Sequence, residues 1–426
     1  MYRTPNPAYN TAMRSDYGAP RFDFFTNPRV VMGLGEFARL PDLVCSMNAS
    51  LQPAPESCRR VLLVRGGESL QQTPQWRNLL RELNSRGIQL YEQEVSCEPS
   101  VELIDGAVED YREEHIQVVV GIGGGSVMDA AKAIAAMLTV SGSVEDYLEG
   151  IGTRQHPGTT LPVVAVPTTA GTGSEATKNS VISKLGRNGY KKSLRHDNFV
   201  PDLAILDGEL SIACPSGITA ACGLDALTQL MEAYTSTKAN LLTDALAISG
   251  LHQLAWALPV CVESSSPEPA ARQAMLYAAY ASGVCLANAG LGVVHGMAGV
   301  IGGRFDIAHG VVCGALLDAA VRVNINTMQR DPASFEHPIN RYRSVGSILC
   351  SAAGNRSGTA AAEGDDGLHR LTALLQDWKL RWNPGSLSRF GVGEQDIPGI
   401  ISASGQKNNP VVLSENDMSD IVHASL

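Results

Sequence analysis

The amino-acid sequence predicts an α/β domain built on a parallel sheet, followed by an all-α domain. Two observations predict this order. Up to about residue 205, short runs rich in Val, Ile and Leu alternate with segments of helical periodicity, which is the pattern of βα units. Beyond that point strand-like runs become rare and helical segments follow one another. We therefore expect residues 1–205 to form the α/β domain and residues 206–426 the helical domain.

The elements of the first domain are predicted from local patterns. The run of β-branched residues from Val118 to Ile122 is typical of a strand buried on both faces. Ser100, with acidic residues after it, is a helix N-terminus signal. Taken along the chain, strands are expected at 61–64, 87–91, 118–122 and 162–166, and helices at 74–86, 100–114 and 126–138.

In the second domain, helices are expected at 219–236, 243–258, 268–289 and 366–378. The 31 residues from Gln273 to Gly303 include no Asp, Glu, Lys or Arg. Polar residues such as Asn288 and His295, together with seven glycines, break this run into pieces too short to span a bilayer. We expect buried helix in a soluble protein, with no membrane partner.

Composition limits the function classes. The 426 residues carry 33 Lys and Arg against 43 Asp and Glu, and this net charge of −10 argues against a nucleic-acid partner. A hydrophobic content of 44% excludes a disordered chain. Nine scattered cysteines without a C-x-x-C pair, and a start without an apolar signal segment, predict no disulfide framework and a cytoplasmic location.

Two small-residue loops predict a nucleotide site. The strand at 118–122 runs into Gly123-Gly124-Gly125-Ser126 and then directly into a helix, whose free N–H groups suit a pyrophosphate. This is neither a G-x-G-x-x-G fingerprint nor a Walker A loop, and a plain tight turn is the alternative. A second loop, from Pro167 to Glu175, follows the next strand and is rich in Thr and Gly. Loops at the carboxyl ends of parallel strands are where open α/β sheets bind ligands.

These loops and three later motifs resemble those of the iron-dependent, or group III, alcohol dehydrogenases. The later motifs are the segment 223–234, His295-Gly296-Met297-Ala298, and Ala308-His309-Gly310, and the resemblance covers about residues 22–424. It implies the dehydroquinate synthase-like fold of this family, with an N-terminal dinucleotide-binding domain, an all-α C-terminal domain and an active site between them. It also implies hydride transfer between NAD or NADP and a small aldehyde or primary alcohol, and a homo-oligomer, at least a dimer, that uses the first strand near residues 29–35.

A divalent metal would lower the pKa of an alcohol and polarise an aldehyde oxygen. Asp225 and Gln229 are spaced i, i+4 and share a helix face, while His295 and His309 are expected on neighbouring helices. Each histidine alone is more often a satisfied core residue, but together with Asp225 and the resemblance they predict an Fe²⁺ or Zn²⁺ site. Asp225, His295 and His309 are the predicted catalytic residues, and the predicted metal ligands are these three and Gln229.

The sequence departs from the family at two positions. The family usually has a histidine where this chain has Gln229, whose amide oxygen would coordinate loosely or leave its place to water. Related glycerol dehydrogenases hold zinc with one Asp and two His, so three strong ligands can suffice. Many members also have a histidine at Gly299; without it, we expect proton relay through cofactor ribose hydroxyls or water.

NAD-preferring members have an Asp after the first strand of this sheet, where this chain has Arg65-Gly66-Gly67-Glu68-Ser69. Without that carboxylate a 2′-phosphate is not repelled, which favours NADP. A lysine near the cofactor in the family matches Lys191, for which a solvated basic loop is the alternative. The predicted cofactor-binding residues are Gly66, Gly67, Ser69, Gly123, Gly124, Gly125, Ser126, Asp129, Thr168, Thr169, Thr172, Ser174 and Lys191.

Three other functions stay open at this stage. A metal-independent reductase resembling maleylacetate reductases is supported by Gln229 and Gly299. A sugar-phosphate cyclase like dehydroquinate synthase would recycle bound NAD, although the loop from Pro167 to Glu175 and the helix of Asp225 fit dehydrogenases better. A nucleotide-binding module without catalysis would bind cofactor and turn nothing over.

Overall fold

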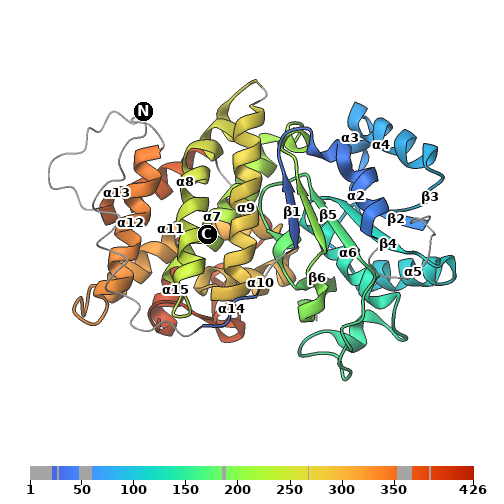
Figure 1. Ribbon diagram of the computed structural model, residues 1–426. Helices are drawn as coiled ribbons and strands as arrows, with labels where there is room; N and C mark the ends of the chain where they lie inside the picture. Colours follow the sequence, from blue (N-terminus) through green and yellow to red (C-terminus); the bar gives the residue numbers. More distant parts are fainter. Residues whose placement is uncertain are drawn as a thin grey trace.

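The structure is a computed structural model in which a sheet-containing part and a helical part lie side by side (Figure 1). It describes residues 22–25, 28–47, 60–184, 189–266, 268–352, 367–382 and 385–426, without the side chains of Glu68 and Ser69. The sheet has six strands in the order β1-β8-β5-β4-β2-β3, and every neighbouring pair is parallel. The strands are β1 (Arg29–Met32), β2 (Arg60–Arg65), β3 (Gln89–Glu94), β4 (Val118–Gly123), β5 (Val163–Pro167) and β8 (Leu203–Leu206).

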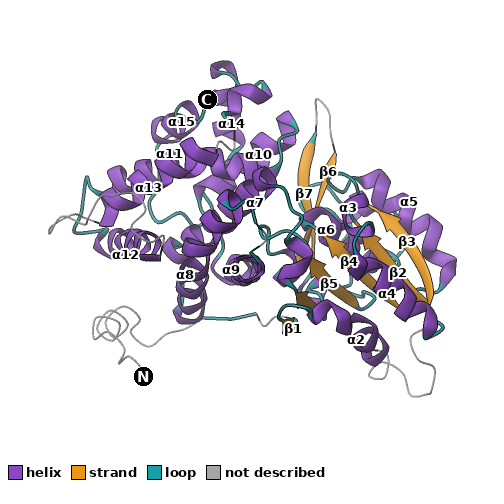
Figure 2. Ribbon diagram, turned by 90° about the horizontal axis from the view of Figure 1, so that it is seen from above, coloured by secondary structure: helices purple, strands orange, loops and turns teal. Residues whose placement is uncertain are grey.

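The predicted parallel sheet is confirmed, and its helices cover both faces (Figure 2). On one face, α2 (Leu40–Met47) and α4 (Pro74–Ser85) pack against the side chains of β2 and β4 that point toward them. On the other face lie α5 (Val101–Tyr111) and α6 (Gly125–Met137), which is rich in buried alanines. The short α3 (Glu68–Gln71) follows β2.

The sequence did not predict three of the strands in the described chain as such. An antiparallel hairpin of β6 (Asn179–Lys184) and β7 (Tyr190–Arg195) has polar, lysine- and serine-containing strands that lack an apolar pattern. The four-residue β8 is completely buried, but it is too short to show a period. The boundary expected after residue 205 falls inside β8, so we place the end of the sheet domain after Leu206.

The described chain after β8 contains helices joined by loops and no β-strand. They are α7 (Ser216–Thr235), α8 (Leu241–Glu263), α9 (Pro269–Ala289), α10 (Val293–Phe305), α11 (His309–Met328), α12 (Glu336–Ala352), α13 (Gly367–Trp382), α14 (Ile397–Ala403) and α15 (Glu415–His423). Fifteen of the twenty residues of α7 are buried, because α8, α9 and α11 surround it. One continuous apolar core joins these helices.

The charge-free run from Gln273 to Gly303 forms most of α9 and α10, as the glycine positions predicted. The chain bends by 103° between them, where Gly290 has a φ of 69°. By length and hydropathy alone, α8 and α11 would be long enough to cross a membrane, and the bent pair would count as a third candidate. In the structure, 72% of the most apolar window of α11 is buried inside the protein, and 44% of that of α8.

Candidate active site

The glycine loop after β4 brings the backbone of α6 tightly against its neighbours. A Cβ on Gly123 would lie 2.5 Å from Val127 Cγ2, and a Cβ on Gly125 would lie 2.6 Å from Thr172 Cγ2. Neither position has room for a side chain. The first N–H groups of α6, beginning at Gly125 and Ser126, are therefore presented at the carboxyl edge of the sheet, where an anion can reach them.

The second loop, after β5, lies directly against the first. The Thr168 N–H donates to the Gly123 carbonyl at 2.9 Å. Thr169 Oγ1 lies 3.2 Å from where a Cβ of Gly124 would be. Both loops are thus brought to one place, with the predicted residues Thr168, Thr169 and Thr172 facing the glycines.

Two predicted cofactor residues bind one another. The Ser174 hydroxyl donates to Asp129 Oδ1, and Asp129 Oδ2 accepts from the Val181 N–H at 2.9 Å. The buried ammonium of Lys132 lies 3.2 Å from Asp129 Oδ1 and donates to the carbonyls of Ser174 and Asn179. These contacts tie the second loop to α6. Asp129 on the helix and Ser174 on the loop therefore hold the two in place by contacting each other and Lys132.

The strand order creates a switch point beside these loops. The chain leaves β2 for β3 on one side and then returns to β4 on the other, so the crevice between β2 and β4 is open at the carboxyl edge. Gly66 follows β2, and its N–H donates to the Ile122 carbonyl of β4 at 3.3 Å. Gly67 is exposed, and the Ser69 side chain lies outside the described part of the chain.

Close backbone contacts join the loops to the helical domain. A Cβ on Gly171 would lie 2.9 Å from Cys222 Cβ on α7, and one on Gly173, which has a φ of 63°, would lie 2.5 Å from the Cα of Gly283 on α9. Lys191 of β7 pairs with Glu98 at 2.6 Å. The second loop therefore lies next to the helix that carries Asp225.

Four potential metal donors converge where α7, α10 and α11 meet. One ligand atom each from Asp225, His295, His309 and Cys313 lies within 4.8 Å of all the others. Asp225 Oδ1 is 3.3 Å from His295 Nε2 and 3.7 Å from His309 Nε2. The structure thus brings together three of the four predicted ligands.

A glycine after each histidine allows this convergence. Without a side chain at Gly310, the first turn of α11 packs on the Ala221 carbonyl of α7, from which a Cβ would be only 2.5 Å away. A side chain at Gly296 would collide with the Gly405 carbonyl. The H-G pairs of the sequence are therefore packing requirements that place the two imidazoles.

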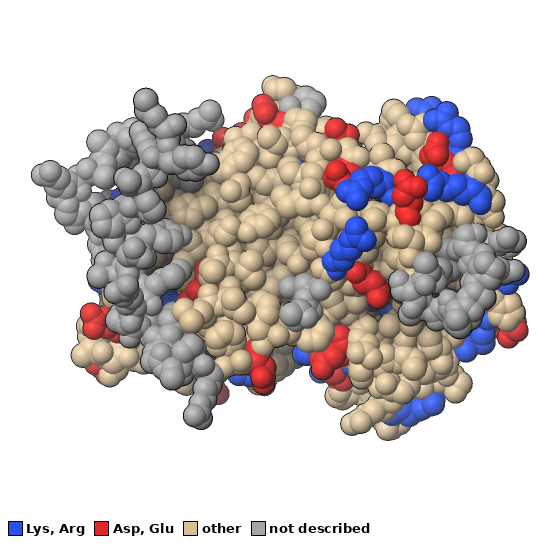
Figure 3. Space-filling view, viewed as in Figure 1, with Lys and Arg blue, Asp and Glu red and all other residues tan. Residues whose placement is uncertain are grey.

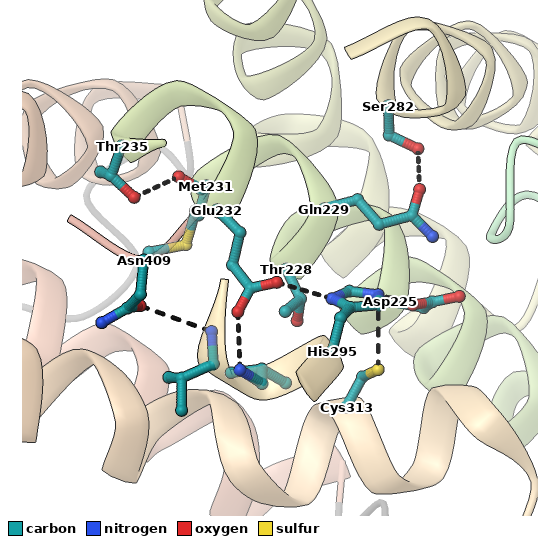
Figure 4. Close-up of polar contacts among 12 residues, drawn as sticks. Asp225, Thr228, Gln229, Met231, Glu232, Thr235, Ser282, His295, Cys313 and Asn409 are labelled. Atoms are coloured by element: carbon teal, nitrogen blue, oxygen red, sulfur yellow. Dashed lines mark hydrogen bonds and ion pairs between the residues drawn. The ribbon is translucent and has the colours of Figure 1, made fainter. Parts of the chain in front are cut away.

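Gln229, the fourth predicted ligand, has another partner. Its Oε1, the only atom of the side chain suited to a metal, accepts a hydrogen bond from Ser282 Oγ at 2.8 Å (Figure 4). At Gly299, a Cβ would meet nothing within 4 Å, so the position is open and no side chain occupies it.

Glu232, one turn of α7 beyond Gln229, fixes the orientation of His295. Its carboxylate accepts from the Val294 N–H at 2.7 Å and lies 2.7 Å from His295 Nδ1 (Figure 4). Nδ1 therefore carries a proton and donates a hydrogen bond to Glu232, while Nε2 faces the other potential metal ligands. Carboxylate–histidine pairs of this kind are the usual outer support of a metal-bound imidazole.

The charges of the cluster are strongly coupled. Burial favours a neutral Asp225, but both histidines outweigh it and lower the pKa of this carboxyl. Burial, followed by the positive charges of His295 and Lys191, lowers the pKa of His309 to about 4 against the pull of Asp225. The pKa of His295 is raised well above its usual value, since Cys313, Glu232 and Asp225 outweigh its burial. The site is therefore a buried anionic pocket that a cation would stabilise.

The sequence prediction missed Cys313 and Glu232. Cys313 lies four residues after His309, and Glu232 lies seven residues after Asp225, so each shares a helix face with a predicted ligand. That spacing was the available signal. Among the described residues, eight cysteines are free thiols and three of them are buried, so composition did not single out Cys313.

Glu232→Gln is expected to weaken metal binding while leaving the fold intact. The amide keeps an acceptor for Nδ1–H but removes the charge that makes His295 a stronger ligand, so we expect Kd for Zn²⁺ to rise about 10–100-fold. Competition with a chromogenic chelator measures Kd, and the exposed Glu415→Gln serves as the control. An unchanged Kd would show that Glu232 does not support the site.

Comparisons with known proteins agree on one family. Residues 27–208 match the model of "Iron-containing alcohol dehydrogenase", and residues 219–426 match "Fe-containing alcohol dehydrogenase family, C-terminal". The NAD-dependent methanol dehydrogenase of Bacillus methanolicus is 31% identical over 77% of this chain and 82% of its own length. Alcohol dehydrogenase 4 of Schizosaccharomyces pombe is 39% identical over 76% of this chain and 70% of its own.

Solved structures have the same fold. A 1,3-propanediol oxidoreductase superposes with a TM-score of 0.79 at 27% identity, covering 95% of this chain and all of that one. The NADH-dependent butanol dehydrogenase A of Thermotoga maritima superposes with a TM-score of 0.78 at 21% identity, over 96% of this chain and 100% of that one, a likeness of fold alone.

Proposed function

The chain belongs to the family of iron-containing alcohol dehydrogenases, and we propose that it acts mainly as a reductase of small aldehydes. It is a metal-dependent oxidoreductase that interconverts alcohols and aldehydes with a nicotinamide cofactor. One observation carries the assignment of the site: the donor cluster and the nucleotide loops adjoin, since Gly171 of the second loop packs on Cys222, less than one helical turn from Asp225.

Asp225, His295 and His309 fit a divalent cation, Fe²⁺ or Zn²⁺, by the chemistry of their atoms and by their spacing. Such a cation supplies Lewis-acid polarisation of the alcohol or aldehyde oxygen. The chain positions these ligands from three helices, and Glu232 holds the tautomer of His295. The His309 side chain is 36% exposed against 4% for His295, so substrate approaches from the His309 side.

The glycine loop is proposed to hold the cofactor pyrophosphate on the N–H groups at the start of α6, which need a close, unobstructed backbone. Thr168, Thr169 and Thr172 offer hydroxyls on the facing loop. Lys191, whose side chain is only 6% exposed, adds positive charge close enough to lower the pKa of His309. Gly299 offers no proton carrier, so we propose that the proton needed to complete aldehyde reduction reaches the substrate oxygen through water or cofactor hydroxyls.

The test is a panel of small aldehydes assayed with NADH and NADPH on metal-free, iron-loaded and zinc-loaded protein. Consumption of reduced cofactor that depends on both aldehyde and metal supports the proposal. Turnover without metal would favour a metal-independent reductase, and a cyclase would convert its substrate with no net consumption of cofactor. The convergence of four donors favours the metal-dependent enzyme over a metal-independent reductase and over a module that only binds nucleotide.

For the cofactor, we propose a preference for NADP. The two residues that follow β2 at the switch point, Gly66 and Gly67, carry no carboxylate, and the side chain of the next residue, Glu68, lies outside the described part of the chain. The guanidinium of Arg65 is held at 2.9 Å by Glu92 and by Glu94. The Gly66 N–H is used by the Ile122 carbonyl, so a 2′-phosphate would meet the N–H group of the exposed Gly67 there. The ratio of kcat/KM for NADPH to that for NADH is expected to exceed one.

Gly66→Asp is expected to reverse this preference. A Cβ at Gly66 would meet only Val127 Cγ2 at 3.7 Å, an ordinary contact, so a side chain fits. The new carboxylate would accept from a 2′-OH and repel a 2′-phosphate, lowering the NADPH-to-NADH ratio on the order of 10²-fold, since facing like charges cost several kcal/mol. Gly66→Asn, of equal size without the charge, is the control. If the two variants had equal ratios of kcat/KM for NADPH to NADH, the 2′ group of the adenosine ribose would not lie near Gly66.

We also propose a homo-oligomer and a cytoplasmic location. The edge strand β1 leaves one side unpaired, and Met32 and Leu34 next to it are 44% and 46% exposed. Charged side chains are sparse on the face that carries α8 and α9 (Figure 3). Sedimentation equilibrium giving only the monomer mass would contradict the oligomer.

A further inference from the structure

The donor cluster contains one ligand-type atom that the proposed function leaves unused, the thiol of Cys313. We propose that Cys313 Sγ, as a thiolate, is the fourth protein ligand of the cation, in the place predicted for Gln229. The inference rests on the proposed function, because it takes that function's metal site as given. It changes the donor set to one carboxylate, two imidazoles and one thiolate.

The spacing of the donors supports this. In a tetrahedral zinc site with ordinary bond lengths, N and O ligands lie ~3.3 Å apart and N and S ligands ~3.5 Å apart. Asp225 Oδ1 lies 3.3 Å from His295 Nε2, and Cys313 Sγ lies 3.7 Å from His295 Nε2 and 3.6 Å from His309 Nε2. Asp225 Oδ1 lies 3.7 Å from His309 Nε2, so these four separations lie close to those that a tetrahedral site requires, and all four atoms lie within 4.8 Å of one another.

Hydrogen bonding alone accounts less well for the contacts between Asp225 and the two histidines. Good N–H···O bonds are ~2.7–3.2 Å long. The two Asp225–histidine distances of 3.3 and 3.7 Å exceed that range, although the neighbouring His295–Glu232 contact is 2.7 Å. The long contacts are those among the four converging donors, and the short one is to the outer carboxylate. This is the pattern of ligands spaced for a shared ion.

The helix geometry keeps Cys313 in this position. It lies one turn after His309 on α11, so both side chains point to the same side, and it is fully buried. Gln229 is directed to Ser282 instead, at 2.8 Å. Figure 4 shows Cys313 beneath the His295 imidazole and Gln229 extended toward Ser282.

A thiolate also alters which metal the site prefers. The two negative charges of Asp225 and Cys313 would neutralise a divalent cation. A soft sulfur ligand in tetrahedral geometry favours zinc over metals that prefer oxygen ligands. Zn²⁺ and its spectroscopic substitute Co²⁺ are therefore the probes for the test.

The test is the absorption spectrum of Co²⁺-loaded protein, with Zn²⁺ affinity as a second measurement. The wild type is expected to show a thiolate-to-cobalt charge-transfer band in the near ultraviolet. Cys313→Ala and Cys313→Ser are expected to lose that band and to bind Zn²⁺ at least about 100-fold more weakly, beyond what loss of an outer support costs. Cys285→Ala is the matched control, because Cys285 is equally buried but donates to the Thr243 carbonyl on α8.

The outcomes separate this inference from the proposed function. Wild-type protein that binds one Co²⁺ per chain without the band, or Cys313 variants that keep it, would overturn the thiolate ligand and leave the metal site standing. Wild-type protein that binds no metal would overturn both. The wild-type spectrum requires no substitution, so a variant that misfolds does not prevent the test.

Discussion

Asp225→Asn is expected to lower kcat/KM for aldehyde reduction by on the order of 10³-fold, because Lewis-acid stabilisation is worth several kcal/mol and depends on this ligand. Asp225 is 1% exposed, and its Oδ1 lies 3.3 Å from His295 Nε2 and 3.7 Å from His309 Nε2. An amide would remove the negative charge that attracts the cation and leave two histidines facing each other. Steady-state kinetics with saturating cofactor, together with metal analysis of the same samples, measure the effect.

The matched control is Asp318→Asn. Asp318 is also a buried aspartate of the helical core, but it pairs with Arg322 at 2.7 Å, outside the donor cluster. It should keep near-normal activity and full metal content. If both variants lose activity equally while remaining folded by circular dichroism, the effect of Asp225 would be structural and its assignment as a ligand would be wrong.

Gly125→Val is expected to have the second large effect, a weakening of NADPH binding by about 10–100-fold, as overpacking a tight site costs 1–3 kcal/mol. Its Cβ alone would lie 2.6 Å from Thr172 Cγ2, so the two nucleotide loops must separate. The side chain would also stand in front of the first N–H groups of α6. Fluorescence titration with NADPH gives Kd.

Gly106→Val provides the comparison for this variant. Gly106 lies within α5 of the same domain, and a Cβ there would meet nothing within 4 Å. It should leave Kd for NADPH unchanged, apart from a small loss of stability. Tight NADPH binding by Gly125→Val would mean that the cofactor does not approach the start of α6.

The sequence predicted those parts of the fold that have strong local patterns. The β-branched run of β4 and the capped helix α5 were found because burial and capping leave their marks on consecutive residues. The hairpin β6–β7 escaped because its strands are polar and are stabilised by packing of α6 against β6, which no local window contains.

The site was predictable to a similar degree. Asp225, His295 and His309 were found through spacing and resemblance, and the structure brings them together. Glu232 and Cys313 are ordinary residues in sequence and become site residues only when three helices converge. The predicted cofactor residue Asp129 also pairs with Ser174 and Lys132, contacts that depend on how the loops fold and that no local pattern shows.

The central claim is that activity depends on a divalent cation held by Asp225, His295 and His309. It is tested most directly by measuring metal content and aldehyde reductase activity on the same purified protein before chelation, after it, and after readdition of Fe²⁺ or Zn²⁺. We expect about one cation per chain. Activity should be lost when the metal is removed and should return when the metal is added back. Full activity in a metal-free preparation would contradict this account.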